Sequence, residues 1–222
     1  MKKRPSSGEW PASHWLNLFG QATALLEQSC PGAAWTFGGG TALALGYEHR
    51  ISYDVDIFLH DAQVLPYLAP RLNDIAASIA LSHEESANGL KIVTHGGDID
   101  FVVTADVTDI APLATNIGET AALVQAPAEI LAKKIQYRGY QFTHRDIFDL
   151  AMLLENDPAQ VDAAVTACSK DAIAAAAEII AVRLPTLSDE LPDYINPTAD
   201  FRSLIGRAPG VLVAFPRVRD FL

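Results

Sequence analysis

The chain has 222 residues, half of them hydrophobic, which is enough apolar material for one large domain or two small ones. Its formal net charge of −11 argues against a general nucleic-acid-binding protein, because such proteins carry a basic surface, but leaves room for an enzyme that contacts RNA through a local basic patch. No run of the sequence approaches the roughly 20 apolar residues that a membrane helix needs, so no membrane segment is expected.

The first quarter of the chain predicts a helix, a strand, a short helix and a second strand. Ser13 is placed to cap the first helix, in which apolar residues from Trp15 to Leu26 recur at helical spacing. The stretch Ala33 to Phe37 then indicates a strand that runs into three glycines. A short helix from Thr41 to Tyr47 and a strand from Asp54 to Leu59 follow.

The next stretch predicts one helix, a hairpin and a further strand. The apolar face of the helix is formed by Leu65, Leu68, Leu72, Ile75 and Ile79. The segments Leu81 to Ser86 and Leu90 to His95 indicate two strands, and the Asn-Gly pair between them favours a hairpin turn. The sequence "GGDIDFVV" from Gly96 gives another turn and strand. We expect an irregular connection near Asp106 to Glu119.

From Pro127 onward the pattern is mostly helical, and an alanine-rich stretch after Asp157 favours close helix packing. The segment Thr186 to Pro197, with its prolines and acidic residues, is typical of a linker before a short terminal helical piece. The sequence therefore predicts an α/β domain over residues 1–125 and a helical domain over residues 126–222.

Two aspartate pairs suggest metal-dependent chemistry. Strand alternation puts Asp54 and Asp56 on one face, where two carboxylates raise each other's pKa unless a cation lies between them. Oxygen ligands with an open side suit Mg²⁺. In "GGDIDFVV", Asp98 and Asp100 also share a face, so Asp100 completes a three-carboxylate cluster if this strand lies beside the first. Such a cluster is typical of two-metal phosphoryl chemistry, and Asp98, nearer its turn, is the weaker candidate.

The glycines before the second helix are candidates for phosphate binding. They allow close approach of the backbone, and a helix that begins at Thr41 directs unpaired N–H groups at a negative ligand. The hydroxyl of Thr41 either contacts that ligand or caps the helix. The alternative is a tight strand-to-helix turn with no ligand. No GK[ST] follows at the spacing of a P-loop.

A pair of cations later in the chain fits the same chemistry. Lys134 and Arg138 are four residues apart, so they share a helix face and can neutralise the β- and γ-phosphates of a nucleotide. Lys133 is about a hundred degrees round the helix and is expected to face solvent. Asp146 is placed to pair with Lys134 or Arg138, while Asp149 is an acid that can simply stabilise its helix.

The stretch "GGTALALGYEHRISYDVDIF" closely resembles the first motif of the AbiEii/AbiGii-type nucleotidyltransferases, toxins of type IV toxin–antitoxin systems within the DNA polymerase β-like superfamily. Glu48 stands where glycine is common in the family. The matching residues are Gly39, Gly40, Thr41, His49, Arg50, Ser52, Asp54 and Asp56. The stretch "AEILAKKIQYRGYQFTHRDIFDLAML" resembles the second signature, a Lys…Arg helix followed by RD-x-x-D. The resemblance spans about Trp35 to Leu154.

The resemblance implies an α+β fold, with a polymerase β-like mixed sheet, flanking helices and a helical C-terminal part. It also implies Mg²⁺-dependent transfer of a nucleoside monophosphate from an NTP to tRNA or protein, and a cognate antitoxin as partner. Asp54, Asp56 and Asp100 would hold two Mg²⁺ ions, with Asp100 positioning or deprotonating the acceptor hydroxyl and Lys134 completing the catalytic set. The candidate NTP-binding residues are Gly39, Gly40, Thr41, Arg50, Arg138, Arg145 and Asp146.

Several readings stay open at this point. Arg50 either binds phosphate or holds the loop before the metal strand by bonding to carbonyl groups. Arg145 with Asp146 serves either the reaction or a structural ion pair. His49 is read as structural. A phosphotransferase using the same NTP and metal site, or a non-catalytic nucleotide-binding module that acts by protein association, are the alternatives to a nucleotidyltransferase.

Location is predicted from two features. The start, Met1 to Trp10, is basic but has no apolar segment behind it, so a secretory signal is not expected. Cys30 and Cys168 lie far apart without CxxC spacing, which favours two reduced thiols over a disulfide or a zinc site. Both features predict a cytoplasmic protein.

Overall fold

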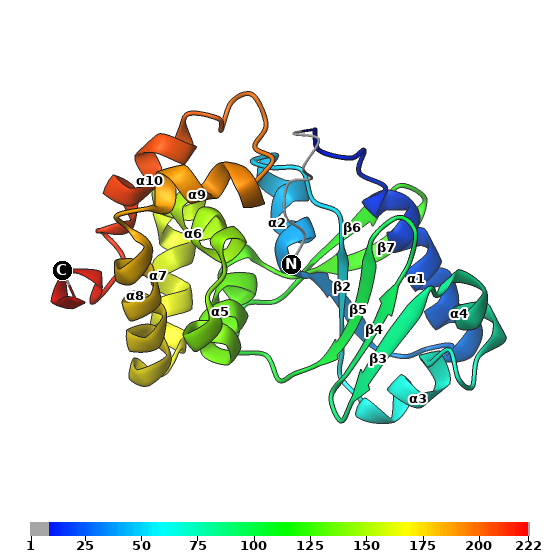
Figure 1. Cartoon of the computed structure of the whole chain (residues 1–222). Coiled ribbons are helices and arrows are strands. Elements are labelled where there is room, and N and C mark those ends of the chain that lie inside the picture. Colours follow the sequence, from blue (N-terminus) through cyan, green and yellow to red (C-terminus); the bar gives the residue numbers. More distant parts are fainter. Residues whose placement is uncertain (1–8, 222) are drawn as a thin grey trace.

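The computed structural model describes residues 9–221, and a mixed sheet lies on one side of the molecule with a group of helices on the other (Figure 1). Within that range one sheet of seven strands has the order β3-β4-β5-β2-β1-β7-β6. The strands are β1 Trp35–Gly38, β2 Val55–Leu59, β3 Ser82–Ser86, β4 Gly89–Val93, β5 Asp98–Val103, β6 Leu113–Ile117 and β7 Thr120–Val124. The expected α+β class is confirmed. The first eight residues, which carry most of the prediction about a secretory signal, lie outside the described range.

Helices cover the sheet on the side away from the helical part. Helix α1 (Trp15–Ser29) packs on β2 and β5 and buries Leu18 and Leu25 almost completely. The short helices α3 (Leu65–Leu68) and α4 (Asp74–Ile79) lie beside it in Figure 1. In strands β2 and β4, buried residues alternate with partly exposed ones. This is the pattern expected for a sheet whose one face is covered by helices.

The helical part follows the sheet along the chain. Its helices are α5 Pro127–Arg138, α6 His144–Asn156, α7 Pro158–Ala167, α8 Lys170–Arg183, α9 Leu187–Tyr194 and α10 Leu204–Leu212. Small buried residues such as Ala164, Ala176 and Ala177 explain the alanine-rich stretch, because they let these helices approach closely. The last strand ends at Val124 and the first helix of the helical part begins at Pro127, so the predicted boundary between residues 125 and 126 lies in the connection between them. The division into two domains at this point stays a prediction.

Helix α2 (Gly39–Tyr47) joins the two parts of the molecule. It contacts β1 and β2 on one side and α5 and α6 on the other, and Figure 1 shows it between the sheet and the helices. The segments on which the sequence places phosphate and metal binding therefore converge at this junction.

Two predictions about helices near the N-terminus were wrong. His14, not Ser13, occupies the cap position of α1, and the Ser13 hydroxyl instead donates to the carbonyl oxygen of Ser52. The single helix expected across residues 65–79 is two short helices, because Asn73 caps a new start by accepting from the N–H groups of Ile75 and Ala76. Leu72 lies between these helices and is 66% exposed.

The strand prediction was right for one hairpin and missed another. The β3–β4 hairpin is confirmed, but its two-residue turn is Ala87-Asn88, because Gly89 is already the first residue of β4 and pairs with Ser86. The connection near residues 106–119 was expected to be irregular, but β6 and β7 form an antiparallel hairpin there, and β7 pairs with β1 in parallel. Four of the five residues of β6 are exposed, so the strand lacks an alternating apolar signal.

The predicted linker from Thr186 to Pro197 is also wrong. Most of it is helix α9, which buries Leu187 and Leu191 completely. Directly after α9, Pro197 forms an antiparallel bridge with Arg50, and the Ile51 N–H donates to the carbonyl oxygen of Asn196 at 2.8 Å. This backbone contact ties the C-terminal helices to the loop before β2.

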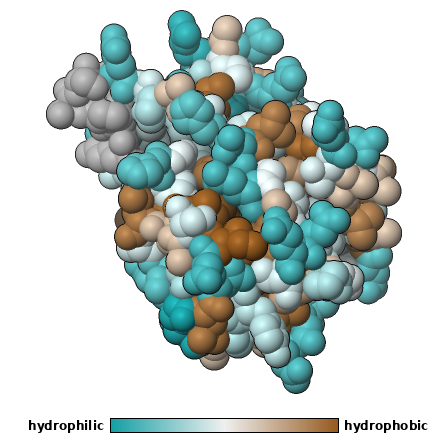
Figure 2. Space-filling view, turned by 90° about the vertical axis from the view of Figure 1, so that its right-hand side faces the viewer, coloured by the Kyte–Doolittle hydropathy of each residue, from teal (hydrophilic) through white to brown (hydrophobic). Residues whose placement is uncertain are grey.

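The surface carries no extended apolar region on the face shown in Figure 2, where hydrophobic side chains form separate patches between hydrophilic ones. In the range 9–221, no helix combines the length and hydropathy that crossing a bilayer demands. Cys30 and Cys168 are both free, partly buried thiols.

Candidate active site

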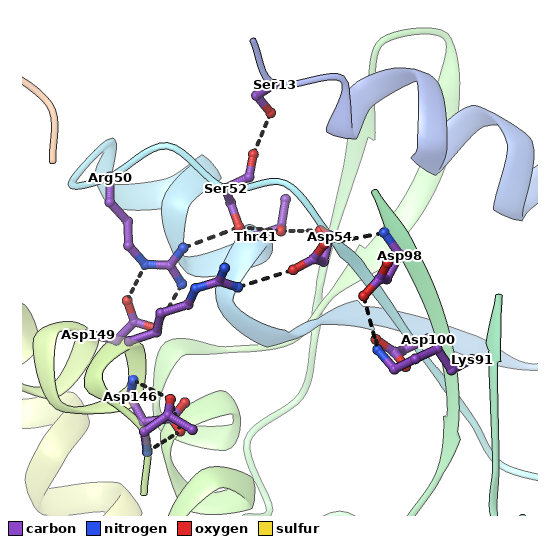
Figure 3. Close-up of polar contacts among 12 residues, drawn as sticks. Ser13, Thr41, Arg50, Ser52, Asp54, Lys91, Asp98, Asp100, Asp146 and Asp149 are labelled. Carbon is purple, nitrogen blue, oxygen red and sulfur yellow. Dashed lines mark hydrogen bonds and ion pairs between the residues drawn. The ribbon is translucent and has the colours of Figure 1, made fainter. Parts of the chain in front are cut away.

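The two aspartate pairs meet on neighbouring strands. Strands β2 and β5 run parallel, and their register places Asp56 beside Asp100. Adjacent strands are about 4.8 Å apart, so alternate residues on the same face bring the carboxylates together. Asp54 immediately precedes β2, and the backbone N–H of Asp98 donates to its Oδ1 at 3.3 Å (Figure 3). The juxtaposition of Asp100 with the first pair is as expected from the sequence.

These strands form one wall of a cavity of about 440 Å³. The opposite walls come from α2, α5 and the start of α6. Every candidate site residue named from the sequence lines it: Gly39, Gly40, Thr41, Arg50, Asp54, Asp56, Asp100, Lys134, Arg138, Arg145 and Asp146. Asp98, the weaker candidate, lines it as well.

Basic side chains hold some of these carboxylates. Arg145 donates to Oδ2 of Asp54 at 3.1 Å. The ammonium group of Lys91 lies 2.8 Å from Oδ2 of Asp100 and 3.4 Å from Oδ2 of Asp98. Over residues 9–221, no three His, Cys, Asp or Glu side chains are already gathered in the arrangement of a metal site. A cation bound by Asp54 and Asp100 would have to replace these basic partners.

Among the residues that the structure describes, no basic side chain forms an ion pair with Asp56. Burial, together with the charges of Asp100 and Asp54, raises the pKa of Asp56 to about 7. Burial also raises the pKa of Asp100, although the neighbouring Lys91 opposes that change. Buried carboxylates that are short of positive charge are a donor set that fits a divalent cation with oxygen ligands. The residues present therefore fit the implied Mg²⁺.

A second acidic group lies across the cavity on α6. Asp149 is fully buried, and its carboxylate receives bonds from His49, Arg50 and Lys134 at 2.6–3.0 Å. Burial alone would raise the pKa of Asp149, but the charges of Arg50 and Lys134 and the hydrogen bonds from His49 and Arg50 hold it well below its usual value. Asp149 is thus an ionised centre that joins the loop before β2 to α5 and α6.

Arg50 takes the second of its two expected roles, but with a different partner. Its guanidinium makes two bonds to Asp149, from Nε at 2.7 Å and from Nη2 at 3.0 Å, and a third to the Ser52 hydroxyl at 3.2 Å (Figure 3). The expected carbonyl partners are replaced by a carboxylate. His49 is completely buried against Asp149, and burial lowers its pKa, so it is a neutral structural residue.

The cationic face of α5 is built as the spacing predicts. Lys134 lies 2.8 Å from Oδ1 of Asp146, and Arg138 lies 3.4 Å from Oδ2 of the same residue. Asp146 also accepts from the N–H and hydroxyl groups of Thr143, which caps α6. Burial opposes ionisation of Asp146, but Lys134 and Arg138 hold its pKa below the usual value.

The expectation that Lys133 faces solvent is wrong. Only 5% of Lys133 is exposed, and its ammonium lies 2.8 Å from Asp106 and 3.1 Å from Glu129. It also lies 4.5 Å from the centroid of the Phe58 ring. The two acids and the ring supply the environment that a buried ammonium requires. Lys133 therefore does not face bulk solvent, and it lines the cavity together with Lys134.

The glycine turn is shaped by protein side chains. Gly39 has a positive φ of 67°, and a Cβ atom there would collide with the carboxylate of Asp56. Gly40 is similarly close to the Arg50 guanidinium. The Thr41 hydroxyl does not cap α2, because the cap residue is Gly38. It bonds instead to the Ser52 hydroxyl at 2.7 Å and to the carbonyl oxygen of Asp54, which fixes the backbone before β2.

The family model for the nucleotidyl transferase AbiEii toxin of the type IV toxin–antitoxin system matches residues 24–222. The chain belongs to the AbiEii family. It is therefore a nucleotidyltransferase. The AbiEii match extends well beyond those motifs and includes the C-terminal third, which the sequence had left without a recognisable signature. Among curated proteins, a sequence search finds no match.

Comparison with solved structures finds likenesses that include the following three, each with a TM-score below 0.5. MenT4, a nucleotidyltransferase toxin from Mycobacterium tuberculosis, is 13% identical, with 93% of this AbiEii chain and 86% of that chain covered and a TM-score of 0.45. JHP933 from Helicobacter pylori is 13% identical over 95% of each chain, with a TM-score of 0.45. The antibiotic-resistance factor ANT(2'')-Ia is 16% identical over 69% of this chain and 90% of that chain, with a TM-score of 0.47.

Sequence reasoning missed the roles of two charged residues at this AbiEii site: Lys91, which lines the cavity, and Asp149, which is fully buried and bonds to the lining residues Arg50 and Lys134. Lys91 could have been found from the hairpin register, because the turn after β4 sets it opposite Asp100. Asp149 was noticed only as a helix-stabilising acid. Its partners His49 and Arg50 lie about a hundred positions earlier, so no local spacing reveals the contact.

Proposed function

We propose that this AbiEii family member transfers a nucleoside monophosphate from an NTP to an RNA or protein acceptor in a Mg²⁺-dependent reaction, with pyrophosphate as the leaving group. The observation that carries the proposal is the opposition of two charge sets across one cavity. Asp56 and Asp100 lie on the strand wall, where the nearby positive charge is too small to keep their pKa values from rising. Lys134 and Arg138 lie on the facing helix α5.

The carboxylates of Asp54, Asp56 and Asp100 are the residues that would hold Mg²⁺. When bound there, the metal would offset phosphate charge and help to polarise the reacting phosphoryl group. Asp100 positions the acceptor hydroxyl and accepts its proton. Of the three carboxylates it is the one on β5, beside Lys91. Burial raises the pKa of Asp100, which favours its taking up a proton.

Residues on the facing helices bind the triphosphate. Lys134 and Arg138 neutralise the charge that shifts to the leaving pyrophosphate. Arg145 exchanges its bond to Asp54 for one to phosphate when Asp54 binds a cation, which keeps both charges matched. Gly39 and Gly40 leave the backbone at the start of α2 close to the same space, where unpaired N–H groups favour an anion.

The family supports the biological setting. It is a family of type IV toxin–antitoxin toxins, so we infer that a cognate antitoxin accompanies this chain and that inhibition of growth is the outcome of the transfer. A cytoplasmic location is part of this proposal, and tRNA is the RNA acceptor that it includes beside a protein acceptor.

The test is label transfer with Mg²⁺, using each NTP labelled in turn at the α- and the γ-phosphate. Total RNA and a protein extract of the source organism serve as acceptors. Label from the α-position alone supports the proposal and the labelled band identifies the acceptor. Label from the γ-position alone shows a phosphotransferase, and no label from either position favours a nucleotide-binding module.

Asp56→Ala is the variant that links the label to this site. It removes a proposed metal ligand and no core volume, so we expect transfer to be abolished while the protein stays folded. Asp162→Ala on α7 is the matched control, because that aspartate is exposed and outside the cavity. Full activity of Asp56→Ala would refute the assignment of the site.

A further inference from the structure

One face of α5 lines the cavity along nearly its whole length. The lining residues of this helix are Ile130, Lys133, Lys134, Tyr137 and Arg138, which recur at the spacing of a single helix face. Lys134 and Arg138 are taken by the proposed triphosphate site. Tyr137 lies between them in the sequence and has no place in that chemistry.

Tyr137 is an aromatic side chain that is both exposed and held in place. It is 43% exposed, whereas the fully buried aromatic residues of the chain belong to the core. Its hydroxyl donates to the carbonyl oxygen of Ala105 at 3.2 Å, in the segment that leaves β5. A ring fixed at its outer end keeps its orientation without covering its faces, so little conformational entropy is lost when a flat ligand stacks on it.

The cavity near Tyr137 differs from the part around the aspartates. Val102, Thr104, Ile130 and Phe58 line the cavity without charge. Thr104 is next to Ala105, to which the Tyr137 hydroxyl is bonded, and Phe58 lies against the ammonium of Lys133, one turn before Tyr137 on α5. That ammonium is already matched by Asp106 and Glu129, so a phosphate group gains little from it. A flat, largely apolar group with hydrogen-bonding edges fits better.

The neighbouring cation places such a group relative to the phosphates. Arg138 follows Tyr137 directly, lines the same cavity, and has a side chain that is 52% exposed. An aromatic face beside an arginine is the combination that single-stranded nucleic acids and nucleotides use, with the base stacked and the phosphate paired.

We propose that Tyr137 is the stacking platform for a nucleobase at the rim of the active-site cavity. The base belongs either to the bound NTP or to the end of an RNA acceptor, and in both cases the contact is the face of the ring. The inference rests on the proposed nucleotidyl transfer and adds a specificity-determining residue to it. Tyr137 contacts substrate without taking part in proton or phosphoryl transfer.

The test compares nucleotides with a probe that has no base. Calorimetric titrations with Mg²⁺ measure the affinity for each of the four NTPs and for inorganic tripolyphosphate. The variants are Tyr137→Leu, which removes the ring, and Tyr137→Phe, which keeps the ring without its hydroxyl. Tyr140→Leu is the matched control, because Tyr140 is 68% exposed two residues beyond α5 and does not line the cavity. Thermal unfolding of each variant reports whether it is folded.

If the base is that of the NTP, Tyr137→Leu weakens binding of the preferred NTP by about 5- to 150-fold and leaves tripolyphosphate binding unchanged. Tyr137→Phe stays within a few-fold of wild type. If the base is that of the acceptor, NTP affinity is unchanged and the KM for RNA rises by a similar factor at saturating NTP.

Two further outcomes separate the inference from the proposed function. Wild-type affinity and wild-type KM for both substrates in Tyr137→Leu would overturn the stacking platform and leave the nucleotidyltransferase intact. An equal loss of NTP and tripolyphosphate binding would also overturn it, because the effect would then be on the phosphate site. A wild-type protein that binds no NTP would overturn the proposed function itself.

Discussion

Two acidic groups beside the same cavity are in opposite electrostatic states. On the strands, Asp56 and Asp100 are partly buried with too little positive charge, and their pKa values are raised. On α6, Asp146 and Asp149 are almost completely buried, but Lys134 and Arg138 hold down the pKa of Asp146, and Arg50 and Lys134 hold down that of Asp149. The more deeply buried pair has the lowered pKa values, so the cationic neighbours rather than burial decide the difference.

This contrast separates residues that hold the protein together from residues that are ready for a ligand. The α6 carboxylates are satisfied within the protein and stabilise its junction between sheet and helices. The strand carboxylates repel each other until a cation arrives, which lowers the stability of the ligand-free protein. Substitutions at the two places should therefore change stability in opposite directions.

The largest effect on stability is expected for Asp149→Ala. It leaves the buried charges of Arg50 and Lys134 without their shared partner, and breaking a buried pair in this way costs about 3–5 kcal/mol of unfolding free energy. Urea unfolding followed by circular dichroism measures the change. The exposed Asp162→Ala control should stay within about 0.5 kcal/mol of wild type. A similarly small loss in Asp149→Ala would show that the α6 group is not a stabilising centre.

The next effect separates the two lysines of α5. Lys134→Met keeps the stem and removes the charge that faces the triphosphate, so kcat/KM for the NTP should fall about 100-fold or more. Lys133→Met should reduce it far less, because that ammonium is matched by Asp106 and Glu129. Steady-state kinetics of the two variants decide the matter. The reverse order would place the phosphates at the Phe58 end of the cavity.

A smaller effect with the opposite sign is expected for Asp56→Asn. The raised pKa of Asp56, about 7, means that the folded protein retains a proton which the unfolded chain releases near pH 4. The resulting penalty in wild type grows as pH rises from 4 to 7 and is complete above 7. Metal-free Asp56→Asn should thus melt several degrees above wild type at pH 8, since each kcal/mol shifts the Tm by about 2–4 °C.

The same difference should shrink steadily as the pH is lowered toward 5. Thermal scans in EDTA across this range provide the measurement, with the inactive Asp56→Asn protein also serving to separate stability from turnover. A Tm below that of wild type at pH 8 would show that Asp56 is already matched by a cation of the protein.

The sequence was sufficient for the features that depend on local pattern. Alternation placed Asp56 and Asp100 on matching faces, and helical spacing placed Lys134 and Arg138 together over Asp146. Lys133 is buried because both Asp106 and Glu129 pair with its ammonium. Glu129 lies one turn earlier on the same helix, so the sequence spacing reveals that pair, but it does not reveal the pair with Asp106.

Features that depend on distant partners were out of reach. The role of Asp149 is set by residues about a hundred positions earlier in the chain, and the exposed strand β6 is fixed by its pairing with β7 rather than by its own apolar pattern. The bridge between Arg50 and Pro197 carries no signal in either segment.

That bridge also bears on the order in which the contacts of the loop before β2 can form while the protein is synthesised. The loop from His49 to Ser52 is held by backbone bonds to residues 196–198, which leave the ribosome long after the loop itself. A nascent chain that has produced the sheet, the acidic strands and α5 still lacks the backbone bonds that residues 196–198 make to this loop. A protein cut just after α9 would lose these bonds to the loop before Asp54 without losing a single cavity-lining residue.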